Sequence, residues 1–289
     1  MANDNVLKQN MEEESSYTTI YMMWLLFKEK CEMPSAKLFK EKLQERLGDI
    51  DVVSDENGVY NYALLSHLVT YENGAKAPAN IMITGCNEVK KPHGDNITRS
   101  QFWSCENGVE LLDSCKYQVL ISDFMAAGLP AQQRATMLAD VLEVALELFP
   151  SCDAVYSAPS GKLLTADAAR QNPYEGILRY MWFGVNARFF NVEGKEDKVV
   201  DTLGLYALGL PDVQYHFHDL DVNRLVNHAY NLAIYQFQND APIKSGDTVD
   251  DIEGKERWKC QYESALIQPK RILLDVETGK NASGNRNVE

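Results

Sequence analysis

Two histidines and two aspartates lie close together and form the sharpest candidate site in the chain. His216 and His218 stand two residues apart, and Asp219 and Asp221 follow directly. Histidines at positions i and i+2 of a strand lie on the same face, so both imidazoles can reach one metal ion. A carboxylate would supply a third ligand and leave one position of a hydrolytic site open. This spacing predicts a metal-dependent hydrolase as one candidate function.

The same residues also fit a purely structural role. Every second residue from Val213 to Phe217 is apolar, which predicts a strand whose histidines lie on a polar, solvated face. Asp219 or Asp221 then precedes an apolar stripe of helical period and is expected to cap a helix over residues 222–238. The pattern H-x-H-x-D-H of dinuclear hydrolases is not met, and motifs this short often match by chance. The structural interpretation is favoured, and no metal ligand is assigned.

A second candidate lies in the polar segment after this helix, residues 239–257. Asp247 and Thr248 stand there in the sequence Ser-Gly-Asp-Thr-Val. Binding residues often lie on such loops, so both are candidate binding residues. The calcium-loop pattern D-x-[DN]-x-[DN]-G is absent, and a surface turn is the favoured interpretation.

The glycines fit turns and close packing better than they fit a nucleotide site. Gly209, Pro211 and Asp212 are expected to form a turn, because proline fixes φ and an aspartate can bond nearby N–H groups. No G-x-G-x-x-G, Walker or G-x-S-x-G sequence is present. The sequence therefore predicts no cofactor, and it favours a non-catalytic binding or interaction module over an enzyme.

The composition limits the partners that such a module would bind. The chain carries 28 Lys and Arg against 42 Asp and Glu, a net charge of −14. This charge repels nucleic acids and anionic membranes, so the expected partner is a protein or a small molecule. The six cysteines show no C-x-x-C spacing, and residues 1–16 do not resemble a signal peptide. A soluble cytoplasmic protein with reduced thiols is therefore expected.

The hydrophobic pattern predicts an α+β fold of two packed lobes with mixed, mostly antiparallel sheets. The first lobe is expected to follow the order β-α-β-β-α-β with an inserted helix, which is the ferredoxin-like pattern. A small ligand in the cleft between the lobes is a third candidate function. The expected boundaries are a disordered lead at 1–16, lobes at 17–160 and 161–278, and a disordered tail at 279–289.

Individual elements follow from the period of the apolar residues and from capping and turn residues. In the first lobe, strands are expected at 20–27, 62–71, 79–85, 117–124 and 154–157, and helices at 35–47, 98–112 and 130–149. In the second lobe, strands are expected at 186–192, 199–208, 213–218, 258–267 and 271–277, with the helix 222–238 among them.

Four segments carry a resemblance to a known family: DTLGLYALGLPDVQYHFHDLD, NLAIYQF, SGDTVD and WKCQYESALIQPKRILLDV, all within residues 199–276. They resemble an uncharacterised bacterial family, the domain-of-unknown-function family 4261. The resemblance implies no activity that can be carried over. Many members have a histidine at the position of Asp247 and lack one at the position of His216, which speaks against a mechanism built on these two side chains.

Overall fold

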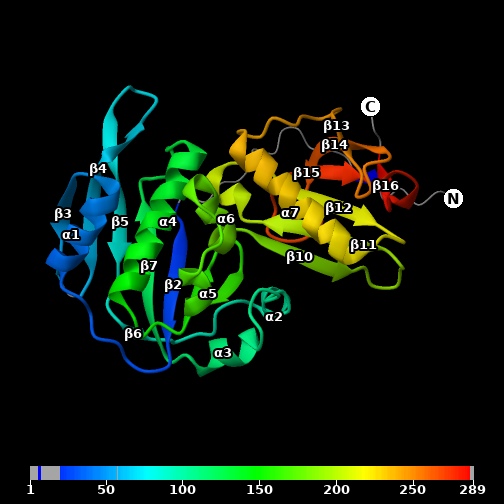
Figure 1. The fold of residues 1–289 in the computed structure, drawn as a ribbon. Coiled ribbons are helices and arrows are strands. Elements are labelled where there is room, and N and C mark those ends of the chain that lie inside the picture. Colours follow the sequence, from blue (N-terminus) through cyan, green and yellow to red (C-terminus); the bar gives the residue numbers. More distant parts are fainter. Residues whose placement is uncertain (1–5, 8–19, 57, 287–289) are drawn as a thin grey trace. The chain divides into compact units, whose positions relative to one another are not determined.

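The structure is a computed structural model that describes residues 6–7, 20–56 and 58–286 (Figure 1). The chain forms two compact units, and the division lies between Gly184 and Val185. We call residues 20–184 the N-terminal unit and residues 185–286 the C-terminal unit. The sequence placed this boundary at residue 160, because it did not predict the strand that follows. Residues 1–16, the expected lead, lie outside the described residues except for 6–7.

Within the described ranges the fold is α+β, with seven α-helices and two mostly antiparallel open sheets. None of these helices is long and apolar enough to cross a membrane.

The N-terminal unit holds one antiparallel sheet in the order β3-β4-β5-β7-β2-β8-β9, and β6 pairs with β7. Its elements are β2 (Met22–Phe27), α1 (Ala36–Leu47), β3 (Ile50–Ser54), β4 (Tyr60–Thr70), β5 (Lys76–Ile83), β6 (Asn87–Glu88), α2 (Asn96–Arg99), α3 (Gly108–Ser114), β7 (Tyr117–Phe124), α4 (Ala131–Leu148), β8 (Ala154–Ser157), β9 (Lys162–Thr165), α5 (Ala166–Arg170), η1 (Gly176–Leu178) and α6 (Arg179–Gly184).

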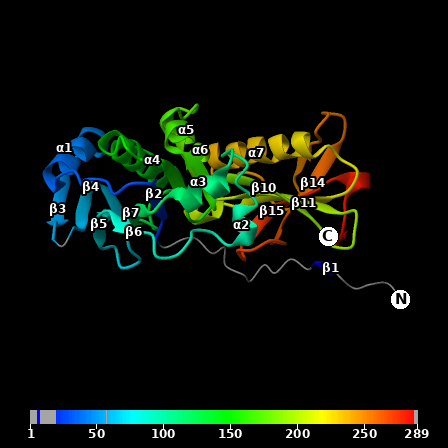
Figure 2. The same cartoon turned by 90° about the horizontal axis from the view of Figure 1, so that it is seen from below.

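The central strands of this sheet, β5-β7-β2-β8, have the predicted ferredoxin-like arrangement. Every neighbouring pair is antiparallel, so strands two places apart run parallel. Helix α1 lies in the connection between the parallel strands β2 and β5, and α4 lies in the connection between β7 and β8. The two helices pack against each other on one face of the sheet (Figures 1 and 2). Strands β3 and β4 extend one edge and β9 extends the other, and β3 and β9 were not predicted.

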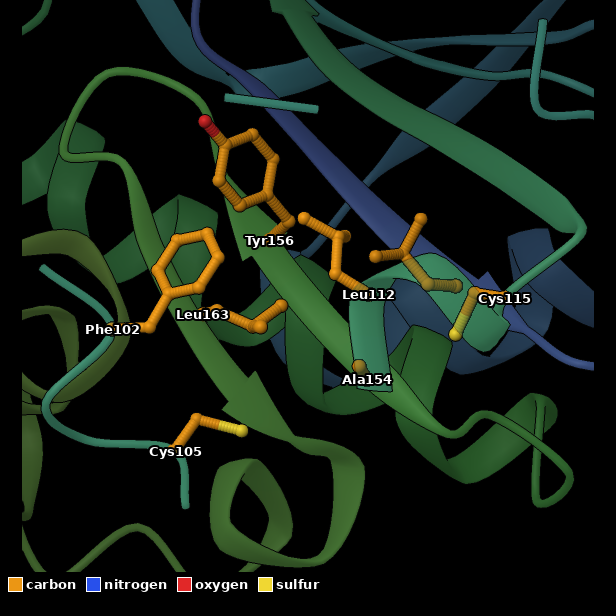
Figure 3. Close-up of a cluster of buried hydrophobic side chains, with 8 residues drawn as sticks. Phe102, Cys105, Leu112, Cys115, Ala154, Tyr156 and Leu163 are labelled. Atoms are coloured by element: carbon orange, nitrogen blue, oxygen red, sulfur yellow. The ribbon is translucent and has the colours of Figure 1, made fainter. Parts of the chain in front are cut away.

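The inserted helix is not continuous, which corrects the helix predicted over residues 98–112. Asp95 accepts a hydrogen bond from the N–H of Thr98 (2.8 Å) and starts the short helix α2 earlier. The chain then runs through turns that bury Phe102 and Cys105 in an apolar cluster with residues of β2, α3, β8 and β9 (Figure 3). Burial of these two side chains against the sheet therefore decides the local backbone, not helix propensity.

The C-terminal unit holds a six-stranded sheet in the order β10-β11-β12-β15-β14-β13. Within this six-stranded sheet, β12 and β15 form the one parallel pair, and α7, β13 and β14 lie in the connection between them. Helix α7 packs against β10, β11 and β12 (Figure 1). The elements are β10 (Asn186–Asn191), β11 (Lys198–Leu203), η2 (Leu205–Leu208), β12 (Asp212–Phe217), α7 (Val222–Gln238), β13 (Thr248–Asp250), β14 (Arg257–Ser264), β15 (Ile272–Glu277), η3 (Gly279–Asn281) and β16 (Asn285–Arg286), which pairs with β1 (Val6–Leu7).

Three features of this unit differ from the sequence-based expectations. The strand expected over residues 199–208 ends at Leu203 and gives way to the 3₁₀-helix η2. The long polar segment contains the edge strand β13. Residues 279–286, expected to be part of a disordered tail, form η3 and β16, and Ala282 forms a β-bridge with Phe217.

Candidate functional site

Strand β12 is buried on both faces, which corrects the prediction of a solvated polar face. Gln214 is 0% exposed and His216 is 8% exposed. Tyr215 faces α7, where its hydroxyl bonds to His228. On the other face Gln214 donates to Asp275 Oδ1 (3.0 Å). The alternation in the sequence therefore separates two buried environments, one apolar and one polar.

His216 and His218 meet an aspartate and a serine that the sequence did not single out. His216 Nε2 lies 3.5 Å from Asp197 Oδ2. His218 Nδ1 lies 3.1 Å from Ser283 Oγ, which lies 3.0 Å from Asp197 Oδ1. We call Asp197, His216, His218 and Ser283 the histidine cluster. It joins the start of β11, the end of β12 and the segment after η3.

The directions of the hydrogen bonds among His218, Ser283 and Asp197 decide whether this cluster could activate the serine hydroxyl. The Ser283 hydroxyl donates to the carboxylate of Asp197, so the Nδ1–H of His218 must donate to the serine oxygen. In a Ser-His-Asp triad the histidine stands between the serine and the aspartate, whereas here the serine stands in the middle. The arrangement orients no imidazole to take the serine proton. It fits a structural tie between β12 and residues 281–283.

Backbone bonds support this structural role. The N–H of His218 donates to the carbonyl of Asn281, and the N–H of Ser283 donates to the carbonyl of His216, both at 2.9 Å. Gly284, at φ 80°, lies directly against the His216 ring, because a Cβ there would stand 2.9 Å from Nδ1. The cluster therefore links residues 281–284 to the end of β12.

The two predicted aspartates have other roles. Asp221 caps α7, where its Oδ1 accepts from the N–H of Arg224 (2.9 Å). Asp219 adopts a left-handed conformation, φ 51°, in the turn between β12 and α7. Among the residues that the structure describes, no group of three or more His, Cys, Asp or Glu side chains is arranged to hold a metal ion. The described part of the chain therefore brings His216 and His218 into no such ligand group.

We expect the substitution Asp197→Ala to loosen the last segment of the C-terminal unit. It removes the acceptor of the Ser283 hydroxyl and the anion beside His216, a loss of about 1–3 kcal/mol for a group with a largely buried partner. Hydrogen exchange at the amides of His218 and Ser283 should accelerate by roughly tenfold or more. The control is Glu196→Ala, which removes the same charge from an exposed neighbour. Equal exchange in both variants would contradict the structural tie.

A second buried group joins two arginines to two aspartates beneath η2. Arg188 holds Asp201 through two contacts, Nε–Oδ1 at 2.8 Å and Nη2–Oδ2 at 2.6 Å. Arg271 bridges the two aspartates, with Nη2 2.8 Å from Asp201 Oδ2 and Nε 3.1 Å from Asp212 Oδ2. Asp201, Asp212 and Arg271 are at most 3% exposed. We call these four side chains the arginine-aspartate network.

The network gives Asp212 more than the predicted turn role. Asp212 is the first residue of β12, and Gly209, with φ 80°, ends η2 just before it. Besides pairing with Arg271, its carboxylate accepts from the N–H of Leu205 (3.0 Å). Burial raises the pKa of Asp212, and the Arg271 guanidinium opposes that rise. The two arginines and two aspartates are buried and paired with one another. The network therefore has a structural role in the sheet.

A concave surface of this unit lies elsewhere, between α7 and the edge strand β13. This groove, which we call the α7–β13 groove, has a volume of about 440 Å³. Thr248, one of the two residues that the sequence offered as binding candidates in this segment, is among the residues that line it. Asp247 instead closes a turn, since its Oδ2 accepts from the N–H of Lys244 (2.7 Å). The groove is lined by His228, Asn231, Leu232, Tyr235, Ile243, Thr248, Val249, Asp250 and Arg257.

His228 of α7 bonds to both strands next to the groove, β12 and β13. Its Nδ1 lies 2.6 Å from the hydroxyl of Tyr215, and its Nε2 lies 2.9 Å from the carbonyl of Asp250. Because a carbonyl can only accept, Nε2 carries the hydrogen and Nδ1 accepts from the tyrosine. Burial lowers the pKa of His228, which favours this neutral form. Both ring nitrogens are therefore engaged in linking α7, β12 and β13.

Side chains bond to two backbone carbonyls of β13. The carbonyl of Thr248 accepts from Arg257 Nη2 (2.7 Å), and the carbonyl of Asp250 accepts from His228. Groups engaged in this way do not pair with an added strand, which is how proteins protect sheet edges. Recognition in the groove would therefore rest on side chains and not on strand addition.

Comparison with known proteins bears on this unit alone. No curated protein and no solved structure matched the chain. One family model matched, described as Domain of unknown function (DUF4261), over residues 201–277. The match covers β12, α7 and the strands β13 to β15, and so includes the whole lining of the α7–β13 groove. It confirms the resemblance found in the sequence: residues 201–277 are similar to the DUF4261 family.

Proposed function

We propose that the C-terminal unit is a protein-binding module whose α7–β13 groove takes an apolar side chain from a positively charged segment of a partner. The observation that carries the proposal is the groove itself. Its floor is apolar, since Leu232 and Ile243 are 9% and 8% exposed, and Tyr235 stands at its side with 49% of its surface exposed. Half-exposed tyrosines beside an apolar floor are typical of interface anchors.

The charge around the groove supports a basic partner. Residues 239–257 contain six acidic and three basic side chains, a net charge of 3 − 6 = −3. The arginine and one lysine among them pair with acidic neighbours, Arg257 with Asp250 and Lys255 with Glu253. Such a surface attracts positive segments and speeds their association. A protein segment with an apolar residue between basic ones complements both properties.

The engagement of His228 supports binding over catalysis. General-base catalysis needs a side chain within reach of the proton that it takes. Both nitrogens of the one histidine in the groove are already bonded within the domain. The third candidate, a small ligand in a cleft between the lobes, stays a prediction.

We expect Tyr235→Ala to weaken partner binding at least tenfold. The change removes a half-exposed aromatic anchor without altering the charge around the groove, and losses above 1–2 kcal/mol are usual for such anchors. The measurement begins with random peptides displayed on phage and selected on the intact protein. Peptides rich in Lys and Arg with one large apolar residue should be enriched, and their affinity should fall as salt concentration rises.

The matched control is Tyr71→Ala, which changes a tyrosine of similar exposure, 41%, in the N-terminal unit. It should leave peptide affinity unchanged. A thermal-shift screen with small organic molecules forms the second arm. The proposal fails if selection yields no basic peptides, or if the selected peptides bind both tyrosine variants as tightly as the unaltered protein.

A further inference from the structure

A second groove lies in the N-terminal unit, on the face of the sheet opposite α1 and α4. Phe27 of β2 packs edge-on against Phe149 after α4, so odd-numbered side chains of this strand face the two helices. Leu26 points the other way, into the apolar cluster with α3 shown in Figure 3, and Trp24 shares that face. The groove has a volume of about 460 Å³ and is lined by Trp24, Asn87, Glu88, Lys90, Lys91, Pro92, His93 and Gln118.

Aromatic rings form one wall of this groove. The rings of Trp24 and His93 lie 4.7 Å apart at 49°, and each also contacts the buried ring of Tyr156, at 6.0 and 5.2 Å. His93 Nε2 lies 2.7 Å from Gln118 Oε1, which can only accept, so Nε2 carries the hydrogen. Burial lowers the pKa of His93, so the ring is neutral near pH 7. The wall is therefore a fixed, uncharged surface of aromatic rings.

Two lysines stand at the same groove. Lys90 and Lys91 are exposed, and within the described residues neither forms a salt bridge. Their two positive charges outweigh the single acid in the lining, Glu88, on a chain whose net charge is −14. A local positive site on an acidic protein favours small anions, whereas a long polyanion would also meet the surrounding negative surface.

We propose that this groove binds a small planar aromatic anion, with its ring against Trp24 and His93 and its anionic group at Lys90 and Lys91. The volume falls within the usual range for small-molecule sites, about 300–1,000 Å³. Aromatic rings stack on such walls irrespective of their exact chemistry, and ammonium groups bind phosphates and carboxylates alike. The amide of Asn87 at the groove supplies a further polar contact.

The test uses adenosine 5′-monophosphate and 2-naphthoate as two anionic aromatic probes. Adenosine carries a ring without an anion, and inorganic phosphate carries the anion without a ring. Titration calorimetry on the intact protein should give a Kd of about 1 mM or tighter for at least one anionic probe. Adenosine and phosphate should bind at least tenfold more weakly. A preference for the nucleotide or for the naphthoate identifies a phosphate or a carboxylate as the matching group.

The double substitution Lys90→Gln and Lys91→Gln should raise the Kd of the anionic probe about three- to tenfold, as expected for the loss of exposed charges. The control is Lys76→Gln with Lys195→Gln, which makes the same change in net charge at two other exposed lysines. The indole N–H signal of Trp24 should shift on titration, and that of Trp258, in the C-terminal unit, should not. The proposal is overturned if neither anionic probe binds, or if both double variants bind it equally.

Discussion

The substitution Arg271→Leu should destabilise the C-terminal unit by about 3–5 kcal/mol, because it leaves a buried carboxylate without its cation. Asp201 keeps its two contacts with Arg188, but Asp212 loses the only guanidinium that reaches it within the described residues. Urea unfolding measures the effect, and faster hydrogen exchange in β11 and β12 locates it. The control is Arg224→Leu, which breaks the exposed pair with Glu253 and should change stability far less.

The loss should also depend on pH with a definite sign. Burial already raises the pKa of Asp212, and without the arginine only the backbone N–H bonds from Gly204 and Leu205 oppose that rise. The folded variant then holds this proton more tightly than the unfolded chain, whose carboxyl ionises near pH 4. In the unaltered protein this pKa is already raised, and in the variant it is higher still. The stability of the variant relative to the unaltered protein should therefore fall as pH rises from the first of these folded-state values to the second. Adding Asp212→Asn should restore part of the loss, and a difference that does not change with pH would contradict the assignment.

The features that the sequence predicted well are set by neighbouring residues. Helix α7 has its predicted bounds, because Asp221 caps it and its apolar residues recur at helical spacing. Helix α1 likewise begins after Ser35, whose Oγ accepts from the N–H of Leu38, and is followed by Gly48 at φ 80°. Caps and periodicity lie within a few residues of each other and can therefore be read locally.

The features that the sequence did not predict depend on residues far apart in the chain. The alternation of apolar and polar residues places His216 on the face of β12 opposite Tyr215. It does not show that residues 281–284 cover that face. The partner Asp197 follows only once β11 is paired with β12, since Lys198 then stands opposite Phe217. The contact between Asp201 and Arg271 spans 70 residues. Burial of polar groups is visible only when such distant partners are known.

The substitution Lys162→Met should stabilise the protein at neutral pH by about 2–4 kcal/mol. Lys162 is 5% exposed and lies 5.2 Å from the ring of Trp182, and burial lowers its pKa to about 7. In the unfolded chain the ammonium keeps its proton up to about pH 10.4, and each unit of difference corresponds to 1.36 kcal/mol. Burying this side chain therefore lowers the free energy of unfolding at every pH below about 10.4, and this destabilisation reaches its full size below pH 7.

The sign of the pH dependence separates this cost from a packing effect. The unaltered protein should gain stability between pH 7 and pH 10 relative to the methionine variant, because its amine loses the proton that burial penalises. Methionine is unbranched like lysine, one atom shorter and uncharged, so at pH 10 the two proteins should differ little. Lys76→Met, at an exposed position, should leave stability unchanged at both pH values. A constant difference between Lys162→Met and the unaltered protein would show that packing, not the buried amine, is responsible.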